Sequence, residues 1–191
     1  MIEVEVKLKI ENIDALKLKL QNIGFTQCEI IKEIDIYFDN RSGDIRLNDS
    51  ALRIRETINE TDNTRFCQLN YKGKKFDNKS MTRLEYETEV ADASATEKIL
   101  NGLGYYSVEP KVIKIRHAYK SSQMNACLDQ VDGLGDYLEL EMIVENESER
   151  GTAFDCIEET LTKLGYNLED TTTVSYLSAL QSQLDNQTCP R

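Results

Sequence analysis

The sequence predicts an α+β fold dominated by about eight antiparallel strands, and two observations lead to that prediction. Residues 2–11 alternate with a period of two, so that every even position is aliphatic and every odd position from Glu3 onward is charged. Similar alternating runs recur along the chain, separated by polar or glycine-containing turns. At 191 residues the chain is long enough to bury a full hydrophobic core.

The strands follow from this alternation. After the first strand, seven further strands are expected at residues 29–38, 51–55, 65–72, 82–90, 111–120, 125–131 and 136–144. The segment 40–50 is polar and is expected to be a loop, whereas Gly133 and Gly135 mark a tight turn.

Four helices are predicted around these strands from their caps and closing glycines. The expected starts and ends are Asn12 or Asp14 with Gly24, Asp92 with Gly104, and Ser148 or Thr152 with Gly165. A last helix is expected over residues 174–184. The sequence therefore predicts one domain over residues 1–184, followed by a tail over 185–191.

Composition excludes several classes of function. The chain has 23 lysine and arginine residues against 34 acidic residues, and this net charge of −11 disfavours nonspecific binding to nucleic acid or to an anionic membrane. The five cysteines are odd in number and widely spaced, which is typical of reduced thiols. His117 is the only histidine, so acid–base and metal chemistry falls mainly on Asp, Glu, Lys, Arg or Tyr. Without a leader or a membrane-length apolar run, we expect a cytoplasmic protein.

Charged side chains share one face on nearly every predicted strand. They are Glu3, Glu5, Lys7, Lys9, Arg53, Arg55, Lys72, Arg83, Glu85, Glu87, Lys114, Arg116, Asp129, Glu139 and Glu141. A flat sheet with one face in water explains this pattern, and so does a closed barrel with the charges inward. A charged lumen needs water, mutual ion pairs or a ligand that carries both charge types. A polyphosphate with divalent cations is such a ligand.

The motifs that contain these residues resemble, in order, those of the CYTH superfamily, the triphosphate tunnel metalloenzymes. They are Glu3-Val4-Glu5-Val6-Lys7, Asp35-Ile36-Tyr37-Phe38-Asp39, Leu52-Arg53-Ile54-Arg55, Tyr71-Lys72-Gly73, Arg83-Leu84-Glu85-Tyr86-Glu87, Lys114-Ile115-Arg116, Leu128-Asp129, Gly133-Leu134-Gly135-Asp136-Tyr137-Leu138-Glu139-Leu140-Glu141 and Ser175-Tyr176. The resemblance implies an eight-stranded antiparallel closed β-barrel, with helices packed outside, that binds a triphosphate and Mg²⁺ or Mn²⁺.

The resemblance also implies roles for single residues. The residues implied to bind phosphate are Lys7, Arg53, Arg55, Lys72, Lys114 and Arg116, with Arg83 as an additional one. Those implied to bind metal are Glu3, Glu5, Asp129, Glu139 and Glu141, and those implied to support them are Asp35, Tyr37, Glu85 and Glu87. Of these residues, Glu5, Lys7, Lys72 and Arg116 are the expected catalytic ones.

Within the superfamily, the layout is most similar to the class IV adenylyl cyclases, which convert ATP to cyclic AMP and pyrophosphate. An inorganic or thiamine triphosphatase is the alternative, and a non-catalytic polyphosphate- or nucleotide-binding module is a third reading. The expected partner is therefore a nucleoside or inorganic triphosphate, with no nucleic acid and no membrane. The sequence does not decide whether the protein is a monomer or a homodimer.

Overall fold

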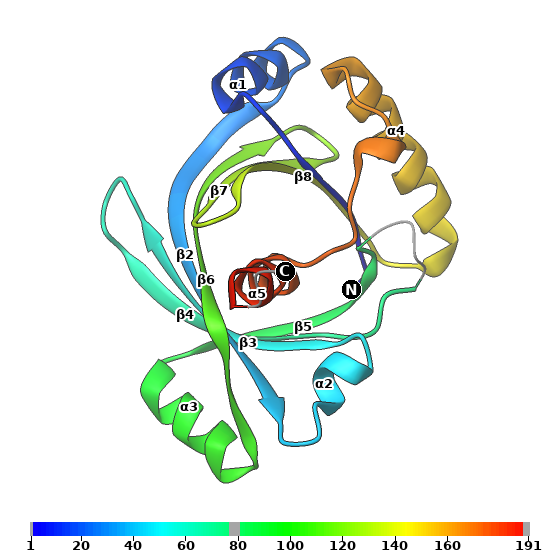
Figure 1. Ribbon diagram of the computed structural model, residues 1–191. Helices are drawn as coiled ribbons and strands as arrows, with labels where there is room; N and C mark the ends of the chain where they lie inside the picture. The colour runs from blue at the N-terminus through cyan, green and yellow to red at the C-terminus, as the bar shows by residue number, and fades with distance from the viewer. Residues whose placement is uncertain (1, 77–80, 189–191) are drawn as a thin grey trace.

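The computed structural model describes residues 2–76 and 81–188, and its strands form a closed antiparallel barrel (Figure 1). The strands are β1 (Ile2–Lys9), β2 (Thr26–Asn40), β3 (Ala51–Asn59), β4 (Arg65–Lys72), β5 (Arg83–Val90), β6 (Tyr105–Lys120), β7 (Asn125–Val131) and β8 (Gly135–Val144). Their order around the barrel is β1-β5-β4-β3-β2-β6-β7-β8. The closed barrel confirms the predicted fold class and excludes the flat sheet.

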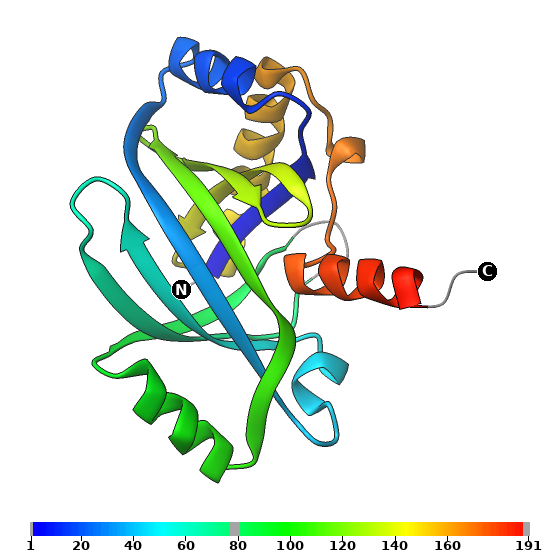
Figure 2. The same cartoon turned by 60° about the vertical axis from the view of Figure 1, so that its left-hand side comes forward.

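The helices lie outside the barrel (Figure 2). They are α1 (Ile13–Asn22), α2 (Asp44–Leu47), α3 (Ala93–Gly102), α4 (Arg150–Leu164) and α5 (Tyr176–Thr188). α1 and α4 pack near one another over β1 and β8, α3 lies beside β3 and β6, and α5 leads away from the barrel. No helix within the described ranges is long and apolar enough to cross a membrane.

The alternation in β1 decides which residues enter the core. Val4, Val6 and Leu8 are at most 1% exposed and join a cluster with α1 and α4 residues such as Leu16 and Leu161 on the outer face of the barrel. Burial of each such side chain contributes about 1.5–3 kcal/mol. The charged side of the same strand consequently faces the barrel interior.

Three strands differ from their predicted bounds by more than two residues: β2, β6 and β3, the last of which runs on from the expected end at Arg55 to Asn59. β6 begins at Tyr105 and runs through Pro110, although the sequence predicted a strand that begins after this proline. The β2–β6 pairing shifts register between Asp35 and Tyr37, opposite Pro110. The proline therefore lies at an irregularity, where a missing N–H does not interrupt a regular ladder. β2 is also longer than predicted, and the expected loop 40–50 contains the short helix α2.

The helix starts follow cap chemistry. Asn12 caps α1 by accepting a hydrogen bond from Ala15 N at 2.9 Å, and Asp92 caps α3, as predicted. Instead of Ser148 or Thr152, the chain uses a capping box of Asn146 and Glu149 ahead of α4. α5 continues through Thr188 instead of ending at 184, so residues 185–188 of the predicted tail are helical and 189–191 lie outside the described residues.

The seam between β1 and β5 is short and is completed by other segments. Only Ile2 and Glu3 of β1 pair with β5. Beyond them, Met81 N donates to Glu5 O at 2.9 Å and Thr172 N donates to Lys7 O at 2.7 Å. The segment that precedes α5 therefore forms part of the barrel wall next to Lys7.

Candidate functional site

A cavity of about 1070 Å³ occupies the barrel interior and is lined mainly by polar and charged side chains. The predicted site residues that line it are Glu3, Glu5, Lys7, Tyr37, Arg53, Arg55, Lys72, Arg83, Glu85, Glu87, Lys114, Arg116, Glu139 and Glu141. The other two, Asp35 and Asp129, are at most 1% exposed and lie behind the lining cations. The structure thus brings the predicted residues together, while their individual roles remain predictions.

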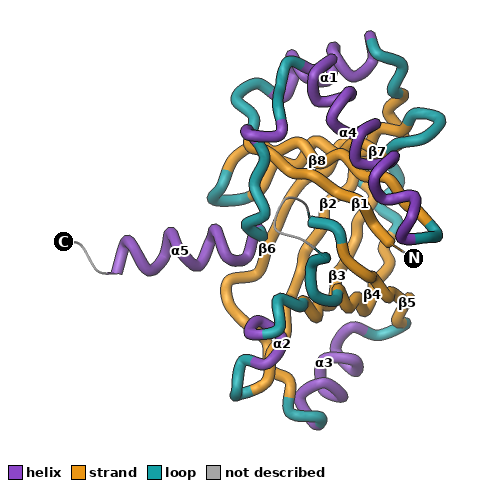
Figure 3. Tube along the Cα trace, turned by 90° about the vertical axis from the view of Figure 1, so that its right-hand side faces the viewer, coloured by secondary structure: helices purple, strands orange, loops and turns teal. Residues whose placement is uncertain are grey.

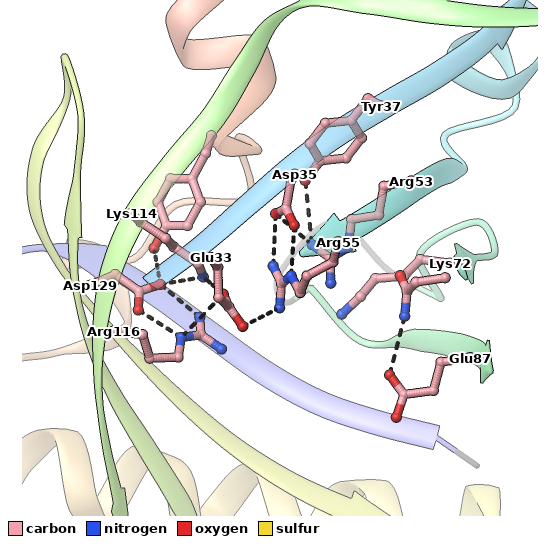
Figure 4. Close-up of polar contacts among 12 residues, drawn as sticks. Glu33, Asp35, Tyr37, Arg53, Arg55, Lys72, Glu87, Lys114, Arg116 and Asp129 are labelled. Atoms are coloured by element: carbon pink, nitrogen blue, oxygen red, sulfur yellow. Dashed lines mark hydrogen bonds and ion pairs between the residues drawn. The ribbon is translucent and has the colours of Figure 1, made fainter. Parts of the chain in front are cut away.

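On one wall, arginines of β3 bind acids of β2 (Figure 4). Arg55 donates to Asp35 from Nε at 2.6 Å and from Nη2 at 2.7 Å, and to Glu33 from Nη1 at 2.8 Å. Arg53 Nη1 lies 3.2 Å from Asp35 Oδ2. Burial alone would raise the pKa of Asp35, but Arg53 and Arg55 lower it. The acids therefore stay ionised and fix the arginine side chains.

On the neighbouring wall, Asp129 of β7 binds two cations of β6 (Figure 4). Lys114 Nζ lies 2.7 Å from Asp129 Oδ2 and 3.0 Å from Glu33 Oε2. Arg116 donates to both oxygens of Asp129, at 2.7 and 2.6 Å, and also pairs with Glu139. Burial alone would raise the pKa of Glu139, but Arg116 and Lys114 lower it.

A third group of contacts lies around Lys72 on β4. Lys72 pairs with Glu3 and lies 3.0 Å from Glu85 Oε2. Asn70 donates to Glu85 and, at 3.5 Å, to Glu87. Burial would raise the pKa of Glu85, but Lys72 lowers it to about 2. Glu85 therefore holds the Lys72 ammonium group, while its supporting role in the site stays a prediction.

Two cations in the cavity, Lys7 and Arg53, have a side-chain nitrogen without an acceptor among the described residues, although Arg53 also pairs with Asp35 through Nη1. Lys7 is 2% exposed, and no carboxylate of the described residues lies within 4.0 Å of its Nζ. Burial lowers the pKa of Lys7, although Glu139 and Glu5 act in the opposite direction. Arg53 Nε is also buried, and it has no hydrogen-bond acceptor within the described ranges. An isolated buried cation is costly, so these donors favour an anionic ligand.

Two carboxylates that line the cavity, Glu5 and Glu141, lack a nearby cationic partner among the described residues. Glu5 and Glu141 are direct partners across β1 and β8, and in the part of the chain that the structure describes neither has a lysine, arginine or histidine nitrogen within 4.0 Å. Burial raises the pKa of Glu141 to about 7, and the charge of Glu3 adds to the effect. Burial also raises the pKa of Glu5, with a further contribution from Glu139. A bound cation would compensate both side chains.

The carboxylates on β1 and β8 are chemically suited to a hard divalent cation. Glu3, Glu5, Glu139 and Glu141 lie on the neighbouring strands β1 and β8 and offer the oxygen ligands that Mg²⁺ and Mn²⁺ prefer. However, no three His, Cys, Asp or Glu side chains among the described residues are close enough together to form a ready-made metal site. Asp129, the fifth predicted ligand, is instead bonded to Lys114 and Arg116. The residues therefore fit the metal in chemistry and require a shift in position to bind it.

Arg83 occupies a different environment from the other predicted phosphate-binding residues. It is 5% exposed, and its guanidinium donates to the carbonyl oxygens of Met81, Asp49 and Gly73 at 3.3–3.4 Å. These contacts join three chain segments at the cavity wall. Its observed contacts are therefore structural, and phosphate binding by Arg83 stays a prediction.

Glu33, for which the sequence predicted no role, is 4% exposed and bridges Arg55 and Lys114. Its spacing of two from Asp35 was the available signal. Tyr176 was noted only as part of a motif, yet its hydroxyl reaches Asp129. His117 is not among the residues that line the cavity, and it interacts with Lys17 and Asp14 of α1.

Known proteins resemble this chain in sequence and in fold. The sequence matches the CYTH domain family over residues 1–176. A Methanocaldococcus jannaschii protein named "putative adenylate cyclase" is 36% identical over 177 residues, which cover 93% of this chain and 97% of that protein. The solved structure of the PH1819 protein from Pyrococcus horikoshii OT3 is 33% identical, with a TM-score of 0.85 over 95% of this chain and 99% of that one.

A more distant structure shares the fold. It is a Hippeastrum protein described as a "putative adenylyl cyclase" with a dominant triphosphatase activity. It is 20% identical to this chain and has a TM-score of 0.64, over 95% of this chain and 96% of that one. At this identity the likeness concerns the barrel alone.

Proposed function

This chain belongs to the CYTH domain family, and we propose that it is a metal-dependent enzyme that acts on a triphosphate bound inside its barrel. The observation that supports this most directly is that the cavity contains unpaired charges of both signs. Lys7 Nζ and Arg53 Nε have no acceptor, and no lysine, arginine or histidine nitrogen lies within 4.0 Å of Glu5 or Glu141, in the described part of the chain. A triphosphate bound with a divalent cation satisfies both groups.

The activity that we propose is that of an adenylyl cyclase. The 3′-hydroxyl oxygen of ATP attacks the α-phosphorus, the bond to pyrophosphate breaks, and the hydroxyl proton is lost. Lys7, Lys72 and Arg116 hold phosphate oxygens and offset the negative charge that develops on them in the transition state. The 36% identity to a protein named "putative adenylate cyclase" supports this choice over other triphosphate chemistry.

We assign the metal to the wall that contains Glu3, Glu5, Glu139 and Glu141. When bound, Mg²⁺ or Mn²⁺ supplies charge neutralisation on the phosphates and acidifies the attacking hydroxyl. Glu5 contributes a carboxylate that has no competing cation within 4.0 Å among the residues described. Asp129 keeps Lys114 and Arg116 in place, and is the least available of the predicted ligands.

A triphosphatase that acts on inorganic or thiamine triphosphate is the second candidate. The reaction would use water instead of the 3′-hydroxyl, and the terminal phosphorus instead of the α-phosphorus. Every charged contact described above serves either reaction, because both need the same phosphate and metal ligands. A non-catalytic binding module is less favoured, because binding alone does not require carboxylates such as Glu5 and Glu141, which have no cationic nitrogen within 4.0 Å in the described ranges.

Product analysis distinguishes these activities. The protein is incubated with Mg²⁺ or Mn²⁺ and, in separate reactions, ATP, inorganic triphosphate and thiamine triphosphate. We expect cyclic AMP and pyrophosphate in equal amounts from ATP. Orthophosphate without a cyclic nucleotide would replace the cyclase with the triphosphatase. Metal-dependent binding without turnover of any of the three would favour the binding module.

A further inference from the structure

Tyr176, the first residue of α5, reaches from outside the barrel into the charged cavity. It is 7% exposed, and its hydroxyl donates to Asp129 Oδ2 at 3.2 Å. The ring faces two ammonium groups, with Lys7 Nζ 4.2 Å and Lys114 Nζ 5.3 Å from its centroid. One phenol therefore contacts two predicted phosphate-binding lysines and the acid that binds one of them.

The start of α5 is held firmly enough to fix this ring. Tyr176 packs in a buried cluster with Val112, Val131, Leu134 and Tyr137, and the ring of Tyr137 meets it edge-on at 5.0 Å. The remainder of α5 leads away from the barrel beside β6 (Figure 3).

The preceding segment adds a backbone connection. Thr172 N donates to Lys7 O at 2.7 Å, and Thr171 bridges to Leu8. Lys7 is therefore contacted from the same C-terminal segment twice, through its backbone by Thr172 and through its ammonium group by Tyr176.

Lys7 and Lys114 differ in whether a carboxylate compensates their charge. Lys114 is compensated by Asp129 and Glu33, whereas Lys7 has no carboxylate within 4.0 Å in the described part of the structure. The face of an aromatic ring attracts an ammonium ion, and the attraction is larger where water is excluded. The Tyr176 ring thus stabilises Lys7 without neutralising it, so the ammonium charge stays available to an anion.

We propose that Tyr176 is a positioning residue for triphosphate binding. Its ring holds Lys7 and Lys114 toward the phosphate oxygens, and its hydroxyl fixes the ring against Asp129. This inference rests on the proposed function and adds to it a residue from the C-terminal helix. The barrel strands alone are then insufficient for tight triphosphate binding.

Three substitutions separate the ring from its surroundings. Tyr176→Phe keeps the ring and removes the hydroxyl, whereas Tyr176→Leu removes both. Leu180→Ala is the matched control, because Leu180 packs α5 into the same cluster but does not line the cavity. The measured quantity is the affinity for sodium tripolyphosphate by calorimetry, in EDTA and then with Mn²⁺, with circular dichroism to check folding.

We expect Tyr176→Leu to weaken tripolyphosphate binding in EDTA by about tenfold or more, and Tyr176→Phe by no more than about threefold. Leu180→Ala should bind like the wild type. Wild-type affinity in Tyr176→Leu, equal losses in Tyr176→Phe and Tyr176→Leu, or an equal loss in Leu180→Ala would overturn the role of the ring. If the wild type itself bound neither tripolyphosphate nor ATP, the proposed function would fail, and this inference with it.

A further variant decides the matter if Tyr176→Leu does not fold. The sequence contains no tryptophan, so Tyr176→Trp introduces a single indole and keeps an aromatic ring at this position. Saturating tripolyphosphate should change the emission of that indole, because the anion binds to the lysines that contact it. An unchanged emission at a concentration that saturates the calorimetric signal would contradict the proposal.

Discussion

Glu5 and Glu141 lie directly opposite each other on β1 and β8, with no cationic side chain within 4.0 Å of either carboxylate in the described part of the protein. Both side chains line the cavity. Two like charges at facing positions of a sheet are destabilising unless something compensates them. In our account the compensating group is a divalent cation that arrives with the triphosphate.

This arrangement predicts that Glu5→Gln weakens metal binding but does not lower the stability of the protein without metal. Affinity for Mn²⁺ in the presence of tripolyphosphate should fall by about tenfold or more, since a charged ligand is lost. The melting temperature in EDTA should equal or exceed that of the wild type, because a buried acid without a partner has been removed. Calorimetry and thermal unfolding measure the two quantities.

Glu11→Gln is the matched control for that experiment, since Glu11 follows β1 and is exposed. It should leave both quantities unchanged. If Glu5→Gln retained wild-type Mn²⁺ affinity, or lost as much stability as a core substitution, Glu5 would not be a metal ligand.

Glu33→Gln should have the reverse effect on stability. The Glu33 carboxylate compensates Arg55 and Lys114, so its loss leaves buried cations without part of their partner set. Removal of one member of a buried ion network costs about 3–5 kcal/mol. Urea unfolding at pH 7 measures the free energy of unfolding.

Glu29→Gln on the same strand provides the comparison for Glu33. Glu29 is exposed, and its substitution should change the free energy of unfolding by less than about 0.5 kcal/mol. Equal, small effects of the two substitutions would mean that the Glu33 network does not stabilise the fold.

The charged face of β1 could be predicted from its sequence, but its direction could not. A solvated sheet and a closed barrel give the same alternation in Glu3, Glu5 and Lys7, and only the pairing of β1 with β5 and β8 decides between them. The order of the family motifs correctly favoured the barrel. Once a closed barrel was assumed, the sequence predicted which residues line the cavity.

Glu33 and Tyr176 show where sequence reasoning failed. Glu33 is in phase with Asp35, but Lys32 stands where the apolar positions Ile34, Ile36 and Phe38 would continue, so the alternation is unclear before Ile34. Tyr176 starts a helix, and no period relates it to a strand at the other end of the chain. Tyr176 contacts Lys7 because the segment before α5 runs along β1 beside the β1–β5 seam. Local sequence patterns do not predict such a long-range contact.

The cysteines offer a test of the packing around the site. Cys127 is 7% exposed, and burial raises the pKa of its thiol to about 12. Cys28 is exposed on β2. Under native conditions at pH 8, iodoacetamide should modify Cys28 at least about 100-fold faster than Cys127, because the buried thiol is neither accessible nor ionised.

Peptide mapping by mass spectrometry gives the two rates separately, and labelling in guanidinium chloride serves as the control in which they should converge. Rapid native labelling of Cys127 would show that β7 opens readily or that the interior beside Arg116 is wet.

If the barrel binds a triphosphate through Lys7, substitutions of Lys7 and of its neighbour Lys9 must affect that binding differently. Lys7 and Lys9 lie two residues apart on β1, but Lys7 is buried against the cavity and Lys9 is exposed. The measurement is calorimetric binding of tripolyphosphate, with and without Mn²⁺, to the wild type, Lys7→Met and Lys9→Met. We predict that Lys7→Met loses about 100-fold in affinity, in line with a charge-assisted contact of roughly 1.5–3 kcal/mol, while Lys9→Met binds like the wild type. Equal affinities of the two variants, or no binding by the wild type, would show that the barrel does not bind a triphosphate through Lys7.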